Sequence, residues 1–149
     1  MTEPLIVDAT RAQLQTVIRW LRKEELEEEA GFYCNRSIIR DSFRKSEMKC
    51  VIVDRVVVGF AIFSLNTSHS KIDIFEIRSR YRRKGYGKKF ASYLIDMLFT
   101  QGAKCIFIEC SPRASEKFWR GLGFVDTEAI PSMFGNPRLE LRTWPTGEN

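Results

Sequence analysis

Histidine and closely spaced cysteines are almost absent from this sequence of 149 residues, which argues against a metal centre. The one histidine is His69, and the four cysteines (Cys34, Cys50, Cys105 and Cys110) include no CxxC pair. Zinc and similar ions need clusters of such ligands at short spacing. Cys50 and Cys105 lie inside apolar runs, where reduced cysteine usually serves as a small core residue. We therefore expect structural thiols and no metal.

Long apolar runs are absent as well. Runs such as 56–58 and 60–63 are far shorter than the roughly 20 apolar residues that cross a bilayer as a helix. Residues 1–4 lack the positive charge and the apolar core of a secretion signal. With 44% hydrophobic and 29% charged residues, the composition is that of a globular protein. We expect a cytoplasmic protein without a membrane partner, folded as one domain over residues 1–149.

Charges of the two signs are segregated along the chain. The net charge is +5, and much of the excess lies in residues 78–84 and in Lys88 and Lys89 just beyond. Such a basic cluster favours a phosphate-bearing partner. Five glutamates lie between residues 24 and 29. These carboxylates fit either the attraction of a cationic amine or a solvated helix end.

The hydrophobic pattern predicts alternating strands and helices. We expect strands over 4–9, 49–53, 56–65, 71–78, 104–110, 124–128 and 138–143, and helices between 10 and 31, over 36–45, from 85 or 87 to 101, and from 112 to 123. Thr10 followed by Gln13 has the form of a capping box at the start of the first helix.

The predicted strand 71–78 changes phase within its length. Ile72 and Ile74 follow one alternation, whereas Phe75 and Ile77 follow the other. Because successive side chains of a strand point to opposite faces, this pattern indicates a bulge.

The segment 82–87, Arg-Arg-Lys-Gly-Tyr-Gly, lies between a predicted strand and a predicted helix. Backbone N–H groups there can converge on an anion together with the helix N-terminus, and the cationic side chains add charge-assisted hydrogen bonds. Glycine is needed where a side chain would hold a phosphate away from the backbone. By itself the pattern fits either a pyrophosphate site or a solvated turn.

Two motifs resemble the signatures of the GNAT superfamily of acetyl-CoA-dependent N-acetyltransferases. Residues 75–87 resemble its R-x-x-G-x-G loop after a strand, and residues 118–124, Phe-Trp-Arg-Gly-Leu-Gly-Phe, resemble its aromatic-x-x-Leu-Gly-Phe motif. The resemblance implies an α/β (α+β) fold of the GNAT type. This fold is a single mixed central sheet of about six to seven strands flanked by about four helices, with a splayed strand pair forming the acyl-CoA cleft.

The resemblance also implies how acetyl-CoA, the acyl donor, would bind. The backbone of Ile77 and Arg78 would pair with the pantetheine arm like an added strand. The thioester would lie near Ile77 and Cys110, with Trp119 in the acyl pocket or the core. The pyrophosphate would lie on the loop formed by Arg82, Arg83, Lys84, Gly85, Tyr86, Gly87 and Lys88.

Transfer to an amine needs donors for the thioester oxygen and, often, a base for the amine proton. The backbone N–H near Ile77 would polarise the carbonyl. Glu76 is our first candidate base, acting directly or through a water, Asp73 is the second and Glu109 is the third. Each carboxylate also fits a solvated strand residue.

The sequence departs from the family where a general acid is concerned. Trp119 stands where the family often has a tyrosine that protonates the departing thiolate, and an indole cannot donate in that way. Cys110, Ser111 or Tyr93 could replace it, or the thiolate leaves unaided. Cys110 could also accept the acyl group, although no histidine partner is evident. Pro112 stands near the place of an asparagine that usually supports the pantetheine.

We therefore expect an N-acetyltransferase that moves the acetyl group of acetyl-CoA to a primary amine of a small molecule, or to a lysine or N-terminal amine of a peptide. Basic residues at 36, 40, 44 and 45, together with the basic cluster between 78 and 89, leave open a tRNA-acetylating enzyme similar to small basic GNAT toxins. A third hypothesis is an acyl-CoA-binding module without catalysis, because the tyrosine is missing. Since GNAT proteins are often dimers, a homodimer also stays open.

Overall fold

A computed structural model of the chain describes residues 3–28, 31–66, 68–127 and 135–144. Glu29, the predicted strand end at 128, the segment 131–134 and the tail after Trp144 lie outside the described residues. The chain divides into two compact units. The first consists of Met1–Phe63 and Ile74–Phe90, and the second of Ser64–Asp73 and Ala91–Asn149.

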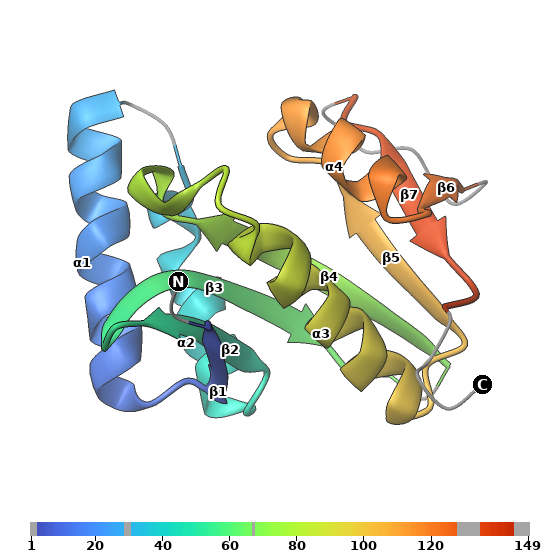
Figure 1. Cartoon of the computed structure of the whole chain (residues 1–149), viewed down its shortest axis with the longest axis horizontal. Coiled ribbons are helices and arrows are strands. Elements are labelled where there is room, and N and C mark those ends of the chain that lie inside the picture. Colours follow the sequence, from blue (N-terminus) through green and yellow to red (C-terminus); the bar gives the residue numbers. More distant parts are fainter. Residues whose placement is uncertain (1–2, 29–30, 67, 128–134, 145–149) are drawn as a thin grey trace. The chain divides into compact units, whose positions relative to one another are not determined.

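The described residues form seven strands and four α-helices (Figure 1). These are β1 (Leu5–Asp8), α1 (Arg11–Glu28), α2 (Arg36–Arg44), β2 (Met48–Val53), β3 (Val56–Ser64), β4 (His69–Ile77), α3 (Tyr86–Thr100), β5 (Cys105–Glu109), α4 (Glu116–Gly121), β6 (Val125–Asp126) and β7 (Arg138–Leu141). The strand order is β1-β2-β3-β4-β5-β7-β6. Strands β4 and β5 run parallel, whereas β1–β2, β2–β3, β5–β7 and β6–β7 are antiparallel pairs. The predicted α/β (α+β) fold with one mixed sheet is thus confirmed.

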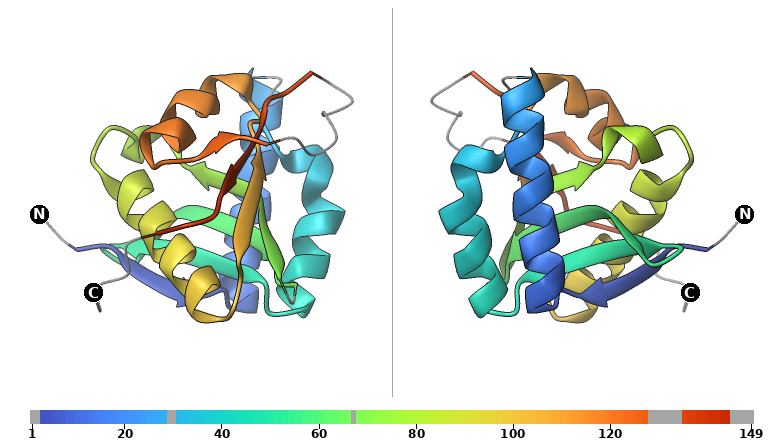
Figure 2. Two further views of the ribbon diagram at one scale, coloured as in Figure 1. Left: turned by 90° about the vertical axis from the view of Figure 1, so that its right-hand side faces the viewer. Right: turned by 90° about the vertical axis from the view of Figure 1, so that its left-hand side faces the viewer.

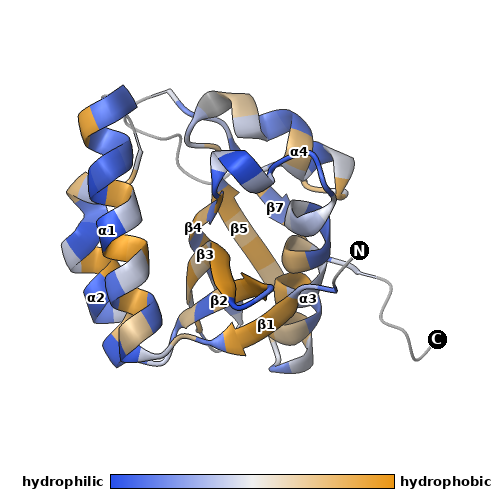
Figure 3. Cartoon of the chain, turned by 60° about the vertical axis from the view of Figure 1, so that its left-hand side comes forward, coloured by the Kyte–Doolittle hydropathy of each residue, from blue (hydrophilic) through white to orange (hydrophobic). Residues whose placement is uncertain are grey.

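Helix α1 of the first unit turns one apolar stripe toward the core. Leu14, Val17 and Leu21 recur at helical spacing and are buried. They pack in one cluster with Ile39 of α2 and Phe60 of β3. The two helices lie side by side, and both carry polar as well as apolar residues, whereas β1 and β3 are mainly apolar (Figures 2 and 3). The stripe therefore fixes which face of α1 meets the sheet.

Strand β4 reverses its alternation once. The ring of Phe75 stacks on that of Phe90 in α3, with 5.2 Å between centroids. Ser70, five residues earlier, lines one pocket together with Leu98 of the same helix. An odd separation puts two residues on opposite faces of a regular strand, so an irregularity must lie between them. This agrees with the bulge indicated by the sequence, and it leaves Glu76 facing away from α3.

Strands β5 and β7 of the second unit have one apolar and one polar face. Their antiparallel register pairs Ile106 with Leu141 and Ile108 with Leu139 on the buried face. The alternate residues pair Phe107 with Glu140 and Glu109 with Arg138. The charged side chains therefore share the other face of this part of the sheet.

Helix α4 begins later than the sequence predicted. Residues 111 and 112 have the composition of an N-cap and a first helical residue, but α4 starts at Glu116. The N–H of Ser115 donates to the Pro112 carbonyl at 2.9 Å and closes a tight turn, Arg113–Ser115, before the helix.

The capping box predicted at the start of α1 is present. The Gln13 N–H donates to Thr10 Oγ1 at 3.2 Å, and the Thr10 N–H donates to Gln13 Oε1 at 3.0 Å. We expect Thr10→Ala to lower the free energy of unfolding by about 1 kcal/mol, because a helix N–H loses its acceptor. Urea denaturation followed by circular dichroism measures this loss. Thr16→Ala is the control, since the exposed Thr16 hydroxyl donates to a carbonyl inside the same helix; an equal loss in both variants would contradict the capping role.

Candidate active site

Glu76, the first candidate base, lies near the end of β4 and is only 7% exposed. The indole Nε1 of Trp20 in α1 donates a hydrogen bond to Glu76 Oε2 at 3.0 Å. Trp20 packs edge-on against Phe60, so the donor is fixed by the core of the first unit. Glutamate is rarely buried to this extent unless it is paired. The structure thus provides a dedicated partner for a carboxyl group that the sequence singled out.

Glu24 supplies the second contact. It lies one turn after Trp20 on α1 and forms a side-chain hydrogen bond with Glu76. Because residues four apart share a helix face, one face of α1 carries both partners. Two carboxyl groups in contact favour sharing a proton over carrying two charges. Burial raises the pKa of Glu76 to about 8, helped by the hydrogen bond and charge of Glu24 and opposed by Arg82 and Trp20.

Arg82 connects this carboxyl group to the loop that follows β4. Its Nε donates to the Ile77 carbonyl at 2.7 Å, and its Nη2 lies 3.9 Å from Glu76 Oε1. A ligand N–H can therefore reach the Ile77 carbonyl only at its second lone pair or by displacing Arg82. The positive charge of Arg82 lowers the pKa of Glu76, whereas the charge of Glu24 on α1 raises it.

The backbone of Arg78 shows which edge of β4 is hydrogen-bonded to β3 at the end of the strand. Its N–H donates to the Val58 carbonyl of β3 at 2.8 Å, and its guanidinium lies over the Trp20 ring at 5.3 Å. In a strand, the N–H and C=O groups of one residue point to the same edge, and those of the next residue point to the opposite edge. Those of Ile77 therefore point away from β3, whereas the N–H of Arg78, the other residue expected to pair with a pantetheine arm, is bonded to β3.

Two residues with positive φ shape the loop between β4 and α3, Arg83 at 63° and Gly85 at 86°. Glycine adopts such values without strain. Helix α3 starts at Tyr86, and the N–H of Lys89 bonds to the Gly85 carbonyl at 3.2 Å. The N–H groups of 86–88 precede this bond and have no partner inside the helix. Free N–H groups at the start of a helix of 15 residues favour a bound anion.

The side chains around this helix start carry positive charge. Arg83, Lys84 and Lys88 are exposed, whereas Lys89 pairs with Glu3 at 3.1 Å. Cations and free helix N–H groups together suit a doubly charged anion. The residues present therefore fit the pyrophosphate that the sequence led us to expect.

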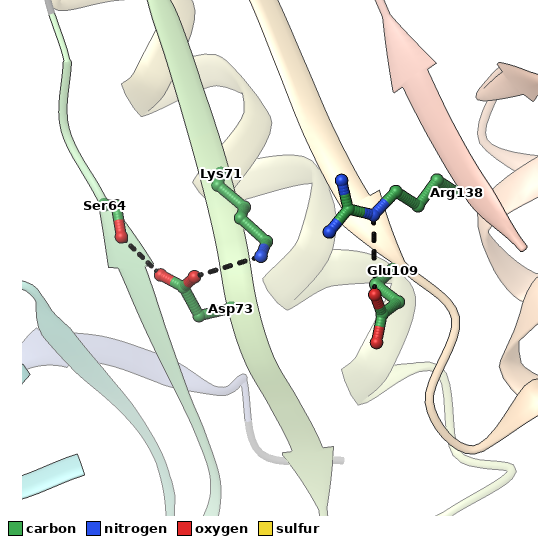
Figure 4. A network of polar contacts seen from close by, with 5 residues as sticks. All are labelled: Ser64, Lys71, Asp73, Glu109 and Arg138. Atoms are coloured by element: carbon green, nitrogen blue, oxygen red, sulfur yellow. Dashed lines mark hydrogen bonds and ion pairs between the residues drawn. The ribbon is translucent and has the colours of Figure 1, made fainter. Parts of the chain in front are cut away.

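The second unit contains the other two candidate bases, Asp73 and Glu109. Asp73 accepts a hydrogen bond from Ser64 Oγ at 2.6 Å, and Lys71 Nζ lies 3.8 Å from its other oxygen (Figure 4). Glu109 accepts from Arg138 Nε at 3.4 Å. Unlike Glu76, both carboxylates are partly exposed and each is paired with a cation.

Cys110 and Trp119 also belong to the second unit, and both are buried. Burial raises the pKa of the Cys110 thiol, and the charge of Glu116 raises it further. A raised pKa keeps the sulfur protonated, which does not suit a nucleophile. Trp119 packs edge-on against Phe118 and Phe124, in the environment of a core aromatic residue.

Sequence reasoning missed Trp20 and treated Glu24 only as one of five glutamates. A signal for Glu24 was present, because it continues the spacing of Val17 and Leu21 along the apolar stripe of α1. A carboxylate in line with a buried stripe indicates a polar partner in the core. Nothing local identified that partner as Glu76.

The described residues were considered for a metal site and for a membrane-spanning helix, and they contain neither. No group of three or more His, Cys, Asp or Glu side chains among them could hold a metal ion. None of their helices is long and apolar enough to cross a membrane.

Replacing Glu76 should change stability in a pH-dependent way. The folded protein holds the Glu76 proton more tightly than the unfolded chain, so stability is lost as pH rises from 4.5 toward about 8. We expect Glu76→Gln to stabilise the fold at pH 8 by up to a few kcal/mol, since each pKa unit corresponds to about 1.4 kcal/mol and the amide can still bond to Trp20 and Glu24. Thermal unfolding between pH 4 and 9 measures the difference, which should vanish at the acidic end; a constant difference would contradict the buried proton.

Residues 12–124 match the family model described as the acetyltransferase (GNAT) family. A search of curated proteins found no match. Among solved structures, N-acetylglutamate synthase from Neisseria gonorrhoeae, complexed with coenzyme A and N-acetyl-glutamate, is similar with a TM-score of 0.75 and 14% identity. The similarity covers 95% of this chain but 35% of that one.

Two shorter proteins are similar over nearly their whole length. The PaiA N-acetyltransferase from Thermoplasma acidophilum, in complex with coenzyme A, has a TM-score of 0.71 and 14% identity over 95% of this chain and 99% of that chain. Ard1 from Thermoplasma volcanium has a TM-score of 0.70 and 19% identity over 92% and 94%. At these identities the structures show the fold, and the family match, which covers most of the sequence, shows the relationship. This chain therefore belongs to the GNAT family of acetyltransferases.

Proposed function

We propose that this protein transfers the acetyl group of acetyl-CoA to a primary amine, carried by a small molecule or by a lysine or N-terminus of a peptide. The observation that carries the proposal is the buried Glu76, whose pKa near 8 suits a base for an amine, on the strand that leads into the anion-binding loop. We also propose that both units act as one domain over residues 1–149. The family match supports this, because it includes parts of both units.

Acetyl-CoA would be held by groups at the end of β4 and the start of α3. The N–H groups of 86–88 and the exposed cations Arg83, Lys84 and Lys88 would bind the pyrophosphate, with Gly85 and Gly87 keeping side chains off the backbone. The N–H and C=O groups of Ile77, which point away from β3, would pair with the pantetheine arm, while Arg78 holds the strand end through its bond to Val58. As that pairing forms, the hydrogen bond from Arg82 Nε to the Ile77 carbonyl would move to the second lone pair of the oxygen or break.

The thioester supplies an activated acetyl group, and the protein supplies a proton acceptor. The neutral amine nitrogen forms a bond to the carbonyl carbon, and the bond from that carbon to sulfur breaks. The amine proton passes to Glu76, directly or through a water, and the sulfur leaves as a thiolate. Asp73 is the alternative acceptor of that proton. The thiolate takes its proton from solvent, because burial raises the pKa of Cys110 and makes its thiol a poor acid. We therefore assign packing roles to Cys110 and Trp119.

Glu24 acts in this scheme as a positioning residue. Its hydrogen bond and charge raise the proton affinity of Glu76, and Trp20 fixes which Glu76 oxygen is engaged. A carboxylate with an ordinary pKa would be a weaker base toward an amine. The face of α1 thus sets the chemistry of a residue on β4.

Release of coenzyme A thiol from acetyl-CoA tests the proposal. Separate pools of small amines, basic peptides and charged tRNA serve as acceptors, and we expect a signal that depends on an amine pool. Glu76→Gln should lower the rate at pH 8 by roughly two orders of magnitude or more, as loss of a general base does. Glu25→Gln on the exposed side of α1 is the control and should leave the rate unchanged. A signal with tRNA alone, or cofactor binding without transfer to any pool, would contradict the proposal.

The pH dependence gives an independent check. We expect kcat/KM to rise with pH through a limb whose midpoint lies near the Glu76 pKa of about 8, because the base must lose its proton. In Glu76→Gln this limb should disappear, while any limb due to the acceptor amine remains. In Glu24→Gln it should move to lower pH, because the charge that raises the Glu76 pKa is removed. Steady-state rates from pH 6 to 10 measure this; an unmoved limb in both variants would assign it to another group.

The placement of the pyrophosphate is tested at Gly87. This residue lies in the first turn of α3, where helical backbone accepts any L side chain. We expect Gly87→Leu to keep the fold and to abolish binding of coenzyme A, because the side chain separates the phosphates from the N–H groups. Isothermal titration calorimetry measures the loss. Lys88→Leu is the comparison, because Lys88 is exposed and its replacement removes a positive charge without covering the N–H group of residue 87. Binding of coenzyme A that survives in Gly87→Leu would overturn the placement.

A further inference from the structure

Gly31 follows α1 and lies against the carboxyl end of Glu24. Glu24 is partly buried, whereas Glu25, Glu27 and Glu28 of the same helix are exposed. A Cβ atom on residue 31 would overlap Glu24 Oε1, and it would lie 3.3 Å from Cδ and 3.5 Å from Cγ of that side chain. The absence of a side chain at residue 31 therefore leaves the space that the Glu24 carboxyl group occupies.

The backbone at Gly31 is held by the residues that follow it. Phe32 and Tyr33 are partly buried and pack against the core of the first unit. The Asn35 N–H donates to the Phe32 carbonyl at 2.9 Å, and Arg36 Nη1 donates to the Tyr33 carbonyl at 3.1 Å. The last torsion of a glutamate side chain is broad and soft by comparison. A side chain added at residue 31 would therefore displace the Glu24 carboxyl group rather than this backbone.

The Glu24 carboxyl group cannot accommodate such a side chain and keep its place. A half-turn about its last bond only exchanges the two oxygens and restores the overlap, because a carboxyl group is planar. Any smaller turn moves both oxygens. The side-chain hydrogen bond between Glu24 and Glu76 depends on the position and direction of one of these oxygens. An added side chain would therefore weaken or break that bond.

We propose that Gly31 is a positioning residue for the candidate base, because the space it leaves holds the Glu24 carboxyl group against Glu76. The inference rests on the proposed function, in which Glu76 takes the amine proton. Gly31 acts through Glu24 and not on the reacting atoms. Its φ of 106° already favours glycine, and the contact with Glu24 is a second and separate requirement.

The charges around Glu76 set the direction of the expected effect. Within the described part of the chain, Glu24 of α1 raises the pKa of Glu76 by its hydrogen bond and its charge, and Arg82 of the loop after β4 lowers it. Strand β3, the neighbour of β4, contains no charged residue. Arg78 lies over the Trp20 ring. Displacing Glu24 weakens both of its contributions and leaves that of Arg82, so the pKa of Glu76 falls.

Gly31→Ala and Gly102→Ala form a matched pair of variants. Gly102 has a φ of 105°, but a Cβ there would have no heavy atom of the described residues within 4 Å, its chain neighbours aside. Both variants therefore carry the strain of a side chain at positive φ, and only Gly31→Ala displaces Glu24. Carbon NMR of protein with labelled glutamate carboxyl groups measures the pKa of Glu76, whose signal is absent in Glu76→Gln. We expect this pKa to fall by roughly 0.5 to 1 unit in Gly31→Ala and to stay unchanged in Gly102→Ala.

A double variant shows whether Gly31 acts through Glu24. In Glu24→Ala the shortened side chain leaves room for a methyl group at residue 31, so adding Gly31→Ala should leave the pKa of Glu76 within about 0.2 unit. A further fall in the double variant, or an equal fall in Gly102→Ala, would overturn the inference. If Gly31→Ala is poorly folded, Glu24→Ala should restore its folding, because the overlap is removed. Folding that is not restored would assign the role of Gly31 to its φ alone and also overturn the inference.

The pH dependence of transfer connects the contact to the reaction. We expect the midpoint of the kcat/KM limb to move to lower pH in Gly31→Ala by the same amount as the pKa measured by NMR. An unchanged Glu76 pKa in Gly31→Ala would overturn the inference and leave the transferase standing. A lowered Glu76 pKa without transfer to any amine would overturn the proposed function and leave the contact between Gly31 and Glu24 standing.

Discussion

The hydrogen bond between Trp20 of α1 and Glu76 of β4 is the contact on which the candidate active site depends. It joins residues 56 positions apart and places a carboxyl group inside the first unit. A buried carboxyl group without a donor would destabilise the fold by several kcal/mol, on the order of the cost of an unpaired buried polar group. The indole N–H offsets part of that cost, and the packing of Trp20 on Phe60 keeps the donor in place. The position of a functional group thus follows from the packing of a helix.

The raised pKa of Glu76 links its proposed role as a base to the stability of the fold. Burial and the neighbouring carboxyl group of Glu24 favour the protonated form, so the folded protein gives up stability between pH 4.5 and about 8. The same shift brings the proton affinity of Glu76 closer to that of an amine, which an ordinary carboxylate does not approach. The loss of stability and the raised proton affinity of Glu76 both come from its burial beside Glu24. A substitution that removes one of these effects therefore removes the other.

Local sequence signals predicted most of the fold, but they did not predict contacts between residues far apart in the sequence. The capping pair Thr10 and Gln13 and the order of strands and helices could be predicted, because each depends on neighbours in the sequence. Glu76 was the first of three candidate bases, on the strand face opposite Phe75 and Ile77. Its partner Trp20 was not predicted, since no local pattern shows which strand the buried face of α1 will meet. Helix α4 was placed too early because a proline turn and a helix start share the same composition.

Arg82 shows how the two halves of the first unit's site are coupled. It belongs to the loop with the free helix N–H groups, yet its Nε occupies the Ile77 carbonyl and its Nη2 lies 3.9 Å from Glu76. Its charge lowers the pKa of Glu76. An anion on the loop that draws Arg82 away would free the carbonyl and raise the proton affinity of Glu76. By linkage, protonation of Glu76 must then favour that anion to the same extent, so the loop and the base form one thermodynamic unit.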